Sequence, residues 1–312
     1  MREIKVRGRK KRHWYIPFLF LLPHLAVFCC FNLLPSLAGI YAAFTKWDLG
    51  QAPQWIGLTN LKTIFTDQSS LFYWELRWGL RNTCLFVLLA VPFRIIVPLL
   101  LATALNTKCP GYKLYQTIFY LPALLSLSVV MGTWNYMFNT NYGIINNFFG
   151  LKNLSWTNTV PLNWRAIIII TVWWGTGSNM VIYQAALAGI PADILEASRV
   201  DGANCVKRFF HIILPAMKYP VSYTLAISII AEFNVWGQPG MFNKGGPVVE
   251  IVNGYARNSN MMLMQYIKDA GFQGAYGSNP GIASAMALVL GCIMVVVSLI
   301  QVHLMQKNSQ EE

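Results

Sequence analysis

Residues 164–188 have the sequence WRAIIIITVWWGTGSNMVIYQAALA, and residues 190–215 follow with IPADILEASRVDGANCVKRFFHIILP. A helix needs about 20 mostly apolar residues to cross the hydrocarbon core of a bilayer. The first stretch meets that length, with Arg165 as its one charged residue. The second stretch is rich in charged and small residues, and its closing Leu214-Pro215 leads into another apolar segment. Together they predict a membrane-crossing helix joined to the next crossing by a structured polar loop.

The same length criterion predicts about six crossings along the 312 residues. The chain is 55% hydrophobic and only 12% charged, whereas a soluble domain carries roughly 25% charged residues, so a compact cytosolic enzyme is excluded. The first crossing is long enough to begin at the interface and to be broken near Pro23 or Pro35. The sequence therefore predicts an all-α membrane protein with crossings at 14–44, 82–105, 116–138, 164–188, 216–236 and 282–305.

Basic residues crowd the N-terminus and set the predicted orientation. The net charge is +12, and a cluster of Lys and Arg fills residues 1–13, directly before the first apolar run. Such a cluster favours the cytoplasmic side, and the run is too long for the apolar part of a signal peptide. No basic surface interleaved with aromatic residues follows, which argues against nucleic acid as a partner. We expect a basic cytoplasmic N-terminus (1–13), one transmembrane domain (14–305) and a cytoplasmic tail (306–312).

Six crossings place both termini and the 190–215 loop on the cytoplasmic side. The long segments 47–81, 139–163 and 237–281 then fall outside, and their Trp, Tyr, Asn, Gly and Pro content suits caps and turns at the far interface. Four basic residues also fall outside, against the positive-inside rule: Lys46, Lys62, Arg77 and Arg81. The orientation therefore rests mainly on the N-terminal cluster.

The sequence predicts neither a metal site nor a catalytic residue. The six cysteines form no CxxC pair, and the four histidines are scattered without the spacing of metal ligands. No cluster of His, Asp and Glu shares one membrane depth, which argues against a membrane-embedded enzyme. A phosphate loop of the form G-x-x-x-x-G-K-[ST] is missing from the sequence, so we expect no cofactor, ATP included, to bind this chain.

The 190–215 loop has the signals of two short helices. Pro191 suits a first helical turn, Asp193 suits the positive end of a helix dipole, and Gly202 suits a left-handed cap. Ala197 and Ser198 are small enough for close backbone approach, and two apolar residues of the same helix, Leu195 and Val200, are suited to insertion into a groove. On spacing alone, an ordinary amphipathic loop helix explains the pattern equally well.

The residues Glu196-Ala197-Ser198, Gly202, Ile212 and Leu214-Pro215 resemble the EAA motif of ATP-binding-cassette (ABC) importer permeases, in which E-A-A, G and I-x-LP occur at this spacing. Other phrases are similar to maltose-type carbohydrate permeases and cover nearly the whole chain: Gly57-Leu58-Thr59-Asn60-Leu61, Leu105-Asn106, Leu121-Pro122, Trp134 with Met137-Phe138, Val200-Asp201-Gly202-Ala203 and Asn243-Lys244-Gly245-Gly246-Pro247. The resemblance implies a type I ABC importer permease fold with a cytoplasmic coupling helix.

The resemblance also implies partners and residue roles. The 190–215 loop would dock on a cytoplasmic ATPase through Glu196, Ala197, Ser198, Asp201, Gly202, Leu214 and Pro215. Two such ATPases would bind ATP and Mg²⁺, a second, homologous permease would complete a heterodimer, and an extracellular solute-binding protein would deliver the sugar. A homodimer stays open. The expected location is the cytoplasmic membrane of a bacterial cell.

This sequence departs from the family at two places. Ser198 replaces the second alanine of the EAA core, a change between small residues that should preserve docking. Trp236-Gly237-Gln238-Pro239 stands where many relatives have Phe-Asp and apolar residues, so the outer end of that helix should turn differently. The large outer insertion of the maltose permease is also missing, so maltose specificity does not carry over.

Polar residues inside the crossings are costly in lipid and usually face a cavity, which makes them candidates for the substrate site. With the resemblance, which places the sugar between the helices on either side of the coupling loop, they are Trp174, Gly175, Ser178, Asn179, Glu232, Asn234, Trp236 and Arg94. Arg94 has two interpretations that stay open here: it offsets the carboxylate of an acidic sugar such as a uronate, or it pairs with Glu232 or a backbone carbonyl.

The predicted function is uptake of a carbohydrate, an oligosaccharide that could be acidic, by an ATP-driven importer. Glycerol phosphate esters are the alternative cargo, because related permeases share the motifs. An ion-coupled secondary transporter would need neither an ATPase nor an EAA loop. Gly245-Gly246-Pro247 is a candidate for shaping an outer gate, and a purely structural turn explains it equally well.

Overall fold

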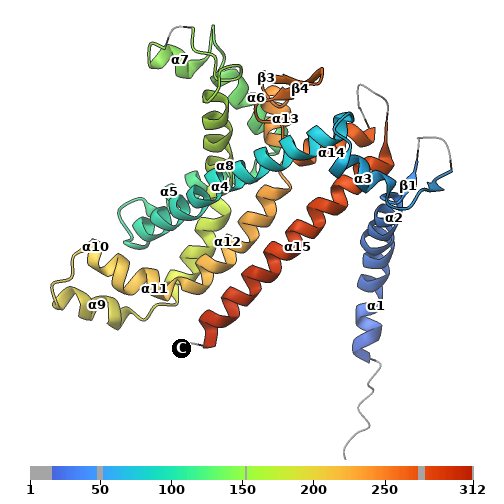
Figure 1. The fold of residues 1–312 in the computed structure, drawn as a ribbon. Helices are drawn as coiled ribbons and strands as arrows, with labels where there is room; N and C mark the ends of the chain where they lie inside the picture. Colours follow the sequence, from blue (N-terminus) through green and yellow to red (C-terminus); the bar gives the residue numbers. More distant parts are fainter. Residues whose placement is uncertain (1–15, 48–51, 152, 273–277, 311–312) are drawn as a thin grey trace, which may run out of the picture.

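The computed structural model describes residues 16–47, 52–151, 153–272 and 278–310, and the chain folds into helices with two short hairpins (Figure 1). The predicted basic segment 1–13 lies outside the described residues, as do the last two residues of the predicted tail. The elements are α1 (Ile16–Phe28), η1 (Cys29–Leu33), α2 (Leu34–Ala42), β1 (Thr45–Lys46), β2 (Gln54–Trp55), α3 (Thr59–Thr66), α4 (Leu71–Asn106), α5 (Tyr112–Tyr120), η2 (Leu121–Leu124), α6 (Leu127–Met137), α7 (Ile144–Phe148), α8 (Leu162–Ala188), α9 (Ala192–Val200), α10 (Cys205–Arg208), η3 (Phe209–Ile213), α11 (Leu214–Ala216), α12 (Lys218–Phe233), α13 (Gly237–Asn243), β3 (Val248–Val252), β4 (Tyr255–Asn258), α14 (Leu263–Phe272) and α15 (Pro280–Gln310).

Within the described residues, four helices are long and apolar enough to cross a membrane: Phe18–Ala42, Leu71–Asn106, Leu162–Ala188 and Pro280–Gln306. Two further pairs meet the criterion together but are sharply bent, by 103° between Tyr112–Leu124 and Leu127–Met137, and by 71° between Cys205–Ala216 and Lys218–Phe233. Counting each bent pair as one span gives the six predicted crossings. The all-α fold class is confirmed, and the two hairpins, β1–β2 and β3–β4, are small antiparallel additions.

The first span is not broken at a proline, as the sequence predicts, but contains one irregular turn. Pro23 lies inside α1, and the irregularity is a π-helical turn, η1, just before Pro35. In that turn the Leu34 N–H donates to the Cys29 carbonyl five residues earlier. Because Pro35 has no N–H, the ladder must change register there, and the wider turn does so without interrupting the helix.

The second span begins earlier than predicted, at Leu71 rather than Asn82. The additional turns carry Glu75, Arg77 and Arg81, and because these residues are charged, a hydropathy criterion leaves the turns out of the span. Ser70 caps the helix by accepting a hydrogen bond from the Phe72 N–H at 3.3 Å. The extension therefore lies beyond the apolar part of the span.

The bend in the third span has a local cause and a distant support. Pro122 lies in the 3₁₀ turn η2, and Ser126 caps the new helix α6 by accepting from the Val129 N–H. The Leu125 carbonyl at the bend accepts a hydrogen bond of 3.1 Å from Trp174 Nε1 on α8. Gly177, one turn further along α8, leaves no room for a Cβ, which would lie 2.8 Å from the Tyr120 Cα. The bend therefore packs directly on α8.

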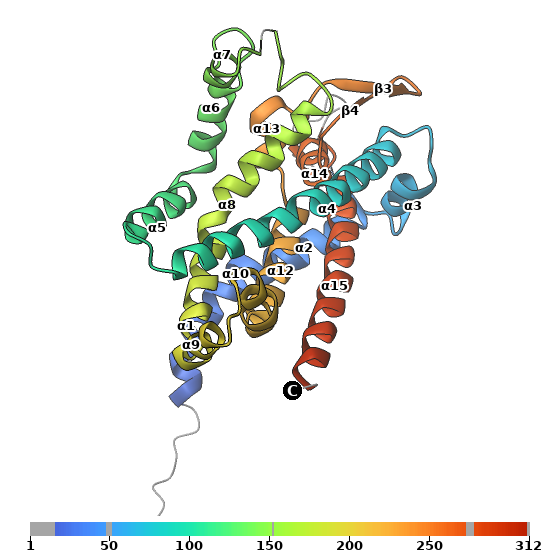
Figure 2. The ribbon, with the colours of Figure 1, turned by 90° about the vertical axis from the view of Figure 1, so that its left-hand side faces the viewer.

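The elements gather at two ends of the molecule in both views (Figures 1 and 2). One end carries α9, α10 and α11 together with the last turns of α15, and we call it the loop end. The opposite end carries α6, α7, α13, α14 and the β3–β4 hairpin, and we call it the far end. Between the ends, α4 crosses α8 and α12, and apolar side chains of α4 and α8 fill two of the three core clusters together.

The contact between α4 and α14 requires a glycine, which gives a test of the packing. A Cβ on Gly79 would lie 2.7 Å from the Leu263 Cα, a backbone atom that cannot move aside. We predict that Gly79→Ala lowers the midpoint of thermal unfolding in detergent, although alanine is favoured over glycine in a helix by about 1 kcal/mol.

The matched control is Gly291→Ala on α15, where a Cβ would meet nothing within 4 Å. We expect this variant to unfold at the midpoint of the unchanged protein or above it. Equal stability of the two variants would contradict the close approach of α4 and α14.

Candidate functional site

The 190–215 loop forms the two predicted short helices, α9 and α10, joined at a glycine. Gly202 has φ +75°, as predicted for a left-handed cap. The Ala203 N–H donates to the Ser198 carbonyl at 3.0 Å and the Gly202 N–H to the Arg199 carbonyl at 3.1 Å, which together make a Schellman motif. Pro191 is not in the first turn as predicted; it is the N-cap residue, and α9 begins at Ala192. A residue with a side chain at position 202 would strain this turn.

The EAA residues divide between the inside and the outside of α9. Ser198 is buried, and its hydroxyl donates to the Leu195 carbonyl at 2.7 Å, so the replacement of alanine leaves no unpaired hydroxyl. Glu196 and Ala197 are exposed. Val200 is 88% exposed, so an apolar side chain stands free at the loop end. This helix therefore presents a carboxylate, a small residue and an apolar side chain to whatever it meets.

Leu214 and Pro215 form the turn that leads into α12. They lie in α11, directly after the π-helical turn η3, and the chain then bends by 71° into α12. Met217, at the bend, is fully buried. Arg199 and Asp201 form no ion pair with any residue in the described part of the chain, so they stand in solvent rather than in an internal salt bridge.

Inside the bundle, Arg94 of α4 pairs with Glu232 of α12. The Arg94 Nη1 group donates to Glu232 Oε1, and Glu232 is only 1% exposed. A Cβ on Gly175 of α8 would lie 2.8 Å from Arg94 Cζ, so any larger residue there would displace the guanidinium from its present position. The predicted pairing with Glu232 is thus present. An arginine and a glutamate that neutralise each other can be buried in an apolar bundle at a lower cost than either group alone.

Asn179 of α8 completes the arrangement around Arg94. Pro98 has no N–H, so the Arg94 carbonyl lacks its donor four residues later in α4. The Asn179 Nδ2 group supplies that donor at 2.9 Å and also lies 3.4 Å from the Ser228 hydroxyl of α12. The asparagine therefore satisfies a backbone group that the proline leaves open, and it connects three helices.

A third polar contact lies nearer the loop end, where the Tyr183 hydroxyl of α8 bonds the Thr224 hydroxyl of α12. Thr224, Ser228 and Glu232 are spaced by four residues and are all buried, so they share one face of α12. We call the three contacts, Arg94–Glu232, Asn179–Ser228 and Tyr183–Thr224, the polar seam. Tyr183, Thr224 and Ser228 were not among the predicted site residues, although the four-residue spacing of Thr224 and Ser228 before Glu232 was a usable signal.

The other predicted site residues lie apart from the seam. Trp174 donates to the bend of the third span, as described above, and Ser178 is exposed on α8. Asn234 ends α12, exposed, and its amide donates to the Ile230 carbonyl at 2.9 Å. Trp236 is the N-cap residue of α13 at the far end, with Lys268 Nζ 4.6 Å from its ring centroid. The structure therefore brings together Arg94, Gly175, Asn179 and Glu232, and not Trp174, Ser178, Asn234 or Trp236.

The Gly245-Gly246-Pro247 segment, a candidate for an outer gate, forms a turn in the structure. Gly245 and Gly246 have φ +90° and +79°, and the Asn260 N–H donates to the Gly245 carbonyl at 3.0 Å, so Gly-Gly-Pro forms the turn between α13 and the β3–β4 hairpin.

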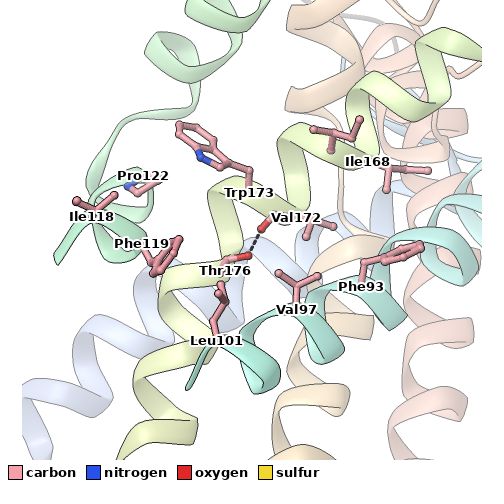
Figure 3. Close-up of a pocket in the computed structure, with 11 residues that line it drawn as sticks. Phe93, Val97, Leu101, Ile118, Phe119, Pro122, Ile168, Val172, Trp173 and Thr176 are labelled. Atoms are coloured by element: carbon pink, nitrogen blue, oxygen red, sulfur yellow. Dashed lines mark hydrogen bonds between the residues drawn. The ribbon is translucent and has the colours of Figure 1, made fainter. Parts of the chain in front are cut away.

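A groove of about 480 Å³ lies between α4, α5 and α8 (Figure 3). It is lined almost wholly by apolar side chains, and its Thr176 hydroxyl is engaged by the Val172 carbonyl at 2.6 Å. Its chemistry suits lipid or an apolar protein face rather than a sugar.

Comparison with known proteins identifies the family. Residues 77–310 match the family described as "Binding-protein-dependent transport system inner membrane component", and this chain belongs to it. The predicted membership in the importer permeases is confirmed, and the chain is a component of a transport system.

Individual relatives are similar to this chain over most of its length. The "Probable ABC transporter permease protein YesP" of Bacillus subtilis (strain 168) is 35% identical over 301 residues, which cover 94% of this chain and 90% of that protein. The "Probable starch degradation products transport system permease protein AmyD" of Thermoanaerobacterium thermosulfurigenes is 28% identical over 98% of this chain and 99% of its own length. A crystal structure of a bacterial ABC transporter involved in the import of the acidic polysaccharide alginate contains a chain with the same fold, at a TM-score of 0.74 and 24% identity, covering 94% of this chain and 96% of that one.

The role of Asn179 can be tested with a double-mutant cycle. We predict that Asn179→Leu lowers the free energy of unfolding by about 1 kcal/mol, because the Arg94 carbonyl loses its donor. In a Pro98→Ala background the restored N–H can bond that carbonyl, so the same substitution should cost less than half as much. Unfolding by a denaturing detergent in mixed micelles measures both costs.

The control background is Pro92→Ala, a second proline of α4 whose replacement does not alter the N–H that faces the Arg94 carbonyl. The cost of Asn179→Leu should be unchanged there. A cost that is the same in all three backgrounds would show that Asn179 does not serve this carbonyl.

Proposed function

We propose that this protein is the transmembrane permease subunit of an ATP-driven ABC importer that takes up an oligosaccharide delivered by an extracellular solute-binding protein. The observation that carries the proposal is the geometry of α9, a short helix at the loop end that is closed at Gly202 and exposes Glu196, Ala197 and Val200. A rigid projecting helix with an apolar tip and a carboxylate suits insertion into a groove of a partner protein.

In this proposal α9 is the coupling helix and docks on a cytoplasmic ABC ATPase. Glu196 accepts hydrogen bonds at that interface, Ser198 keeps the helix close to its own chain, and Gly202 and the Leu214-Pro215 turn fix its direction. ATP and Mg²⁺ bind to the partner ATPases, and this chain binds no cofactor. The loop end is then cytoplasmic, in the cytoplasmic membrane of a bacterium, with the N-terminus on the same side.

One coupling helix engages one ATPase, so two permeases are needed for two ATPases. We propose a heterodimer with a second, homologous permease. The far end then meets the solute-binding protein, and closure of the ATPases turns the cavity between the permeases toward it, as rigid-body alternating access.

The names of the relatives support an oligosaccharide as the cargo, because AmyD is named as a permease for starch degradation products. Ser178 and Asn234 are exposed polar residues on the helices that flank the loop, and they suit contact with sugar hydroxyls. Arg94, Gly175, Asn179 and Glu232 would support the site from inside, because they are engaged with one another.

The test is ATP hydrolysis by the assembled transporter in liposomes. The complex is purified with its partner subunits, and hydrolysis is measured with and without sugar-loaded binding protein. We expect stimulation by the loaded protein, and Glu196→Ala should reduce the stimulated rate at least tenfold, equivalent to about 1.4 kcal/mol, because an interfacial carboxylate is lost.

The control is Asp193→Asn in the first turn of the same helix, which removes a charge but not the proposed contact. It should retain most of the stimulated rate. Equal losses in the two variants would assign the effect to the charge of α9. Uptake driven by an ion gradient, with no associated ATPase, would contradict the importer function, and stimulation only by a binding protein loaded with glycerol 3-phosphate would contradict the sugar.

A further inference from the structure

A pocket of about 420 Å³ lies at the far end, between α13 and α14, away from the polar seam. It shares no lining residue with the Arg94–Glu232 cluster, and of the predicted site residues only Trp236 lines it. Its chemistry combines an aromatic ring with charged and amide groups, from Trp236, Met241, Lys244, Gln265, Lys268 and Asp269.

The lining of this pocket carries more positive than negative charge. Lys244 ends α13 in a left-handed conformation at φ +54°, and Lys268 lies over the Trp236 ring. Asp269 is the one acidic lining residue, and neither lysine makes an ion pair within 4.0 Å in the described part of the chain. Burial raises the pKa of the Asp269 carboxyl above its ordinary value, and the Lys268 ammonium opposes that rise. Two ammonium groups against one carboxylate suit an anionic ligand.

A buried acceptor in the same pocket is unused. Gln265 is 7% exposed, and its Oε1 atom, which is itself buried, has no hydrogen-bond partner among the residues that the structure describes. Its amide lies against α13, because a Cβ on Gly240 would be 3.8 Å from Gln265 Cδ. A buried acceptor without a donor costs free energy, and a hydroxyl of a bound ligand can supply the donor. This unpaired amide oxygen points to a hydroxylated ligand.

We propose that the far-end pocket binds a sugar ring that carries a carboxylate, as the first contact of the saccharide with this subunit. Trp236 offers an aromatic face to the ring, the ammonium groups of Lys244 and Lys268 bind the carboxylate, and Gln265 accepts from a hydroxyl. The volume of the pocket limits the contact to the end of a longer chain. This assignment rests on the proposed function, because it takes the far end to be the side at which sugar arrives.

Trp236 and Lys268 also line a neighbouring apolar pocket of about 480 Å³ between α14 and α15. The indole therefore stands at the boundary between a polar and an apolar hollow. Such a position fits an amphipathic ring, whose hydroxyls and carboxylate face one side and whose C–H face meets the indole.

The test is direct binding to the whole transporter in lipid nanodiscs, without the solute-binding protein. The probes are α-1,4-linked digalacturonate and α-1,4-linked galactobiose, which share ring stereochemistry and differ in the carboxylates. We expect digalacturonate to bind at least about tenfold more tightly than galactobiose, and Lys268→Gln to abolish that difference, because a hydrogen bond to a charged group is lost. Gln265→Leu should weaken both ligands.

The control is Lys62→Gln, an exposed lysine on α3 that does not line the pocket. It should leave the preference unchanged. Equal affinity for the two disaccharides, no binding of either, or an equal effect of Lys62→Gln would overturn the assignment. ATP hydrolysis stimulated by a loaded binding protein is measured on the same samples, so the pocket can be disproved while the importer function stands.

Discussion

Burial of opposite charges on α4 and α12 is the constraint on which the bundle depends. Neither Arg94 nor Glu232 is stable alone in an apolar interior, so the two helices must lie where the groups meet. Gly175 of α8 admits the guanidinium, and Asn179 of the same helix bonds the carbonyl that Pro98 leaves open. The ion pair fixes α4 against α12, and Gly175 and Asn179 attach α8 to both, so the rest of the core packs around three helices.

Two contacts of the polar seam, Asn179–Ser228 and Tyr183–Thr224, join the two helices that flank the 190–215 loop. Because α8 leads into the loop and α12 leaves it, a force on α9 reaches both helices. Hydrogen bonds between buried partners, unlike apolar contacts, resist sliding, since any shift would leave polar groups unpaired in a dry interior. The loop, α8 and α12 are therefore suited to move as one body, which is the kind of motion that a permease driven from one end requires.

Local signals in the sequence predicted much of the fold but little of the site geometry. The six spans follow from apolar length, and the cap at Gly202 follows from the residue preferences of helix ends. The first turns of α4 were missed because Glu75 and Arg77 are polar, although the helix continues beyond the apolar part. The contacts of Asn179 and Trp174 join residues 85 and 49 positions apart, and no local pattern indicates which carbonyl a distant side chain will meet. Gln265 and Lys268 were missed because they lie in a segment interpreted as caps and turns.

The order of the helices along the chain has a consequence for biosynthesis. Arg94 precedes its partner Glu232 by 138 residues, so α4 enters the membrane with an unpaired arginine. At about 5–20 residues per second, the partner is synthesised roughly 7–28 s later. During that interval a guanidinium within a spanning helix costs about 2.5–3.5 kcal/mol for insertion. The ion pair between α4 and α12 can therefore form only after the fifth span has been translated.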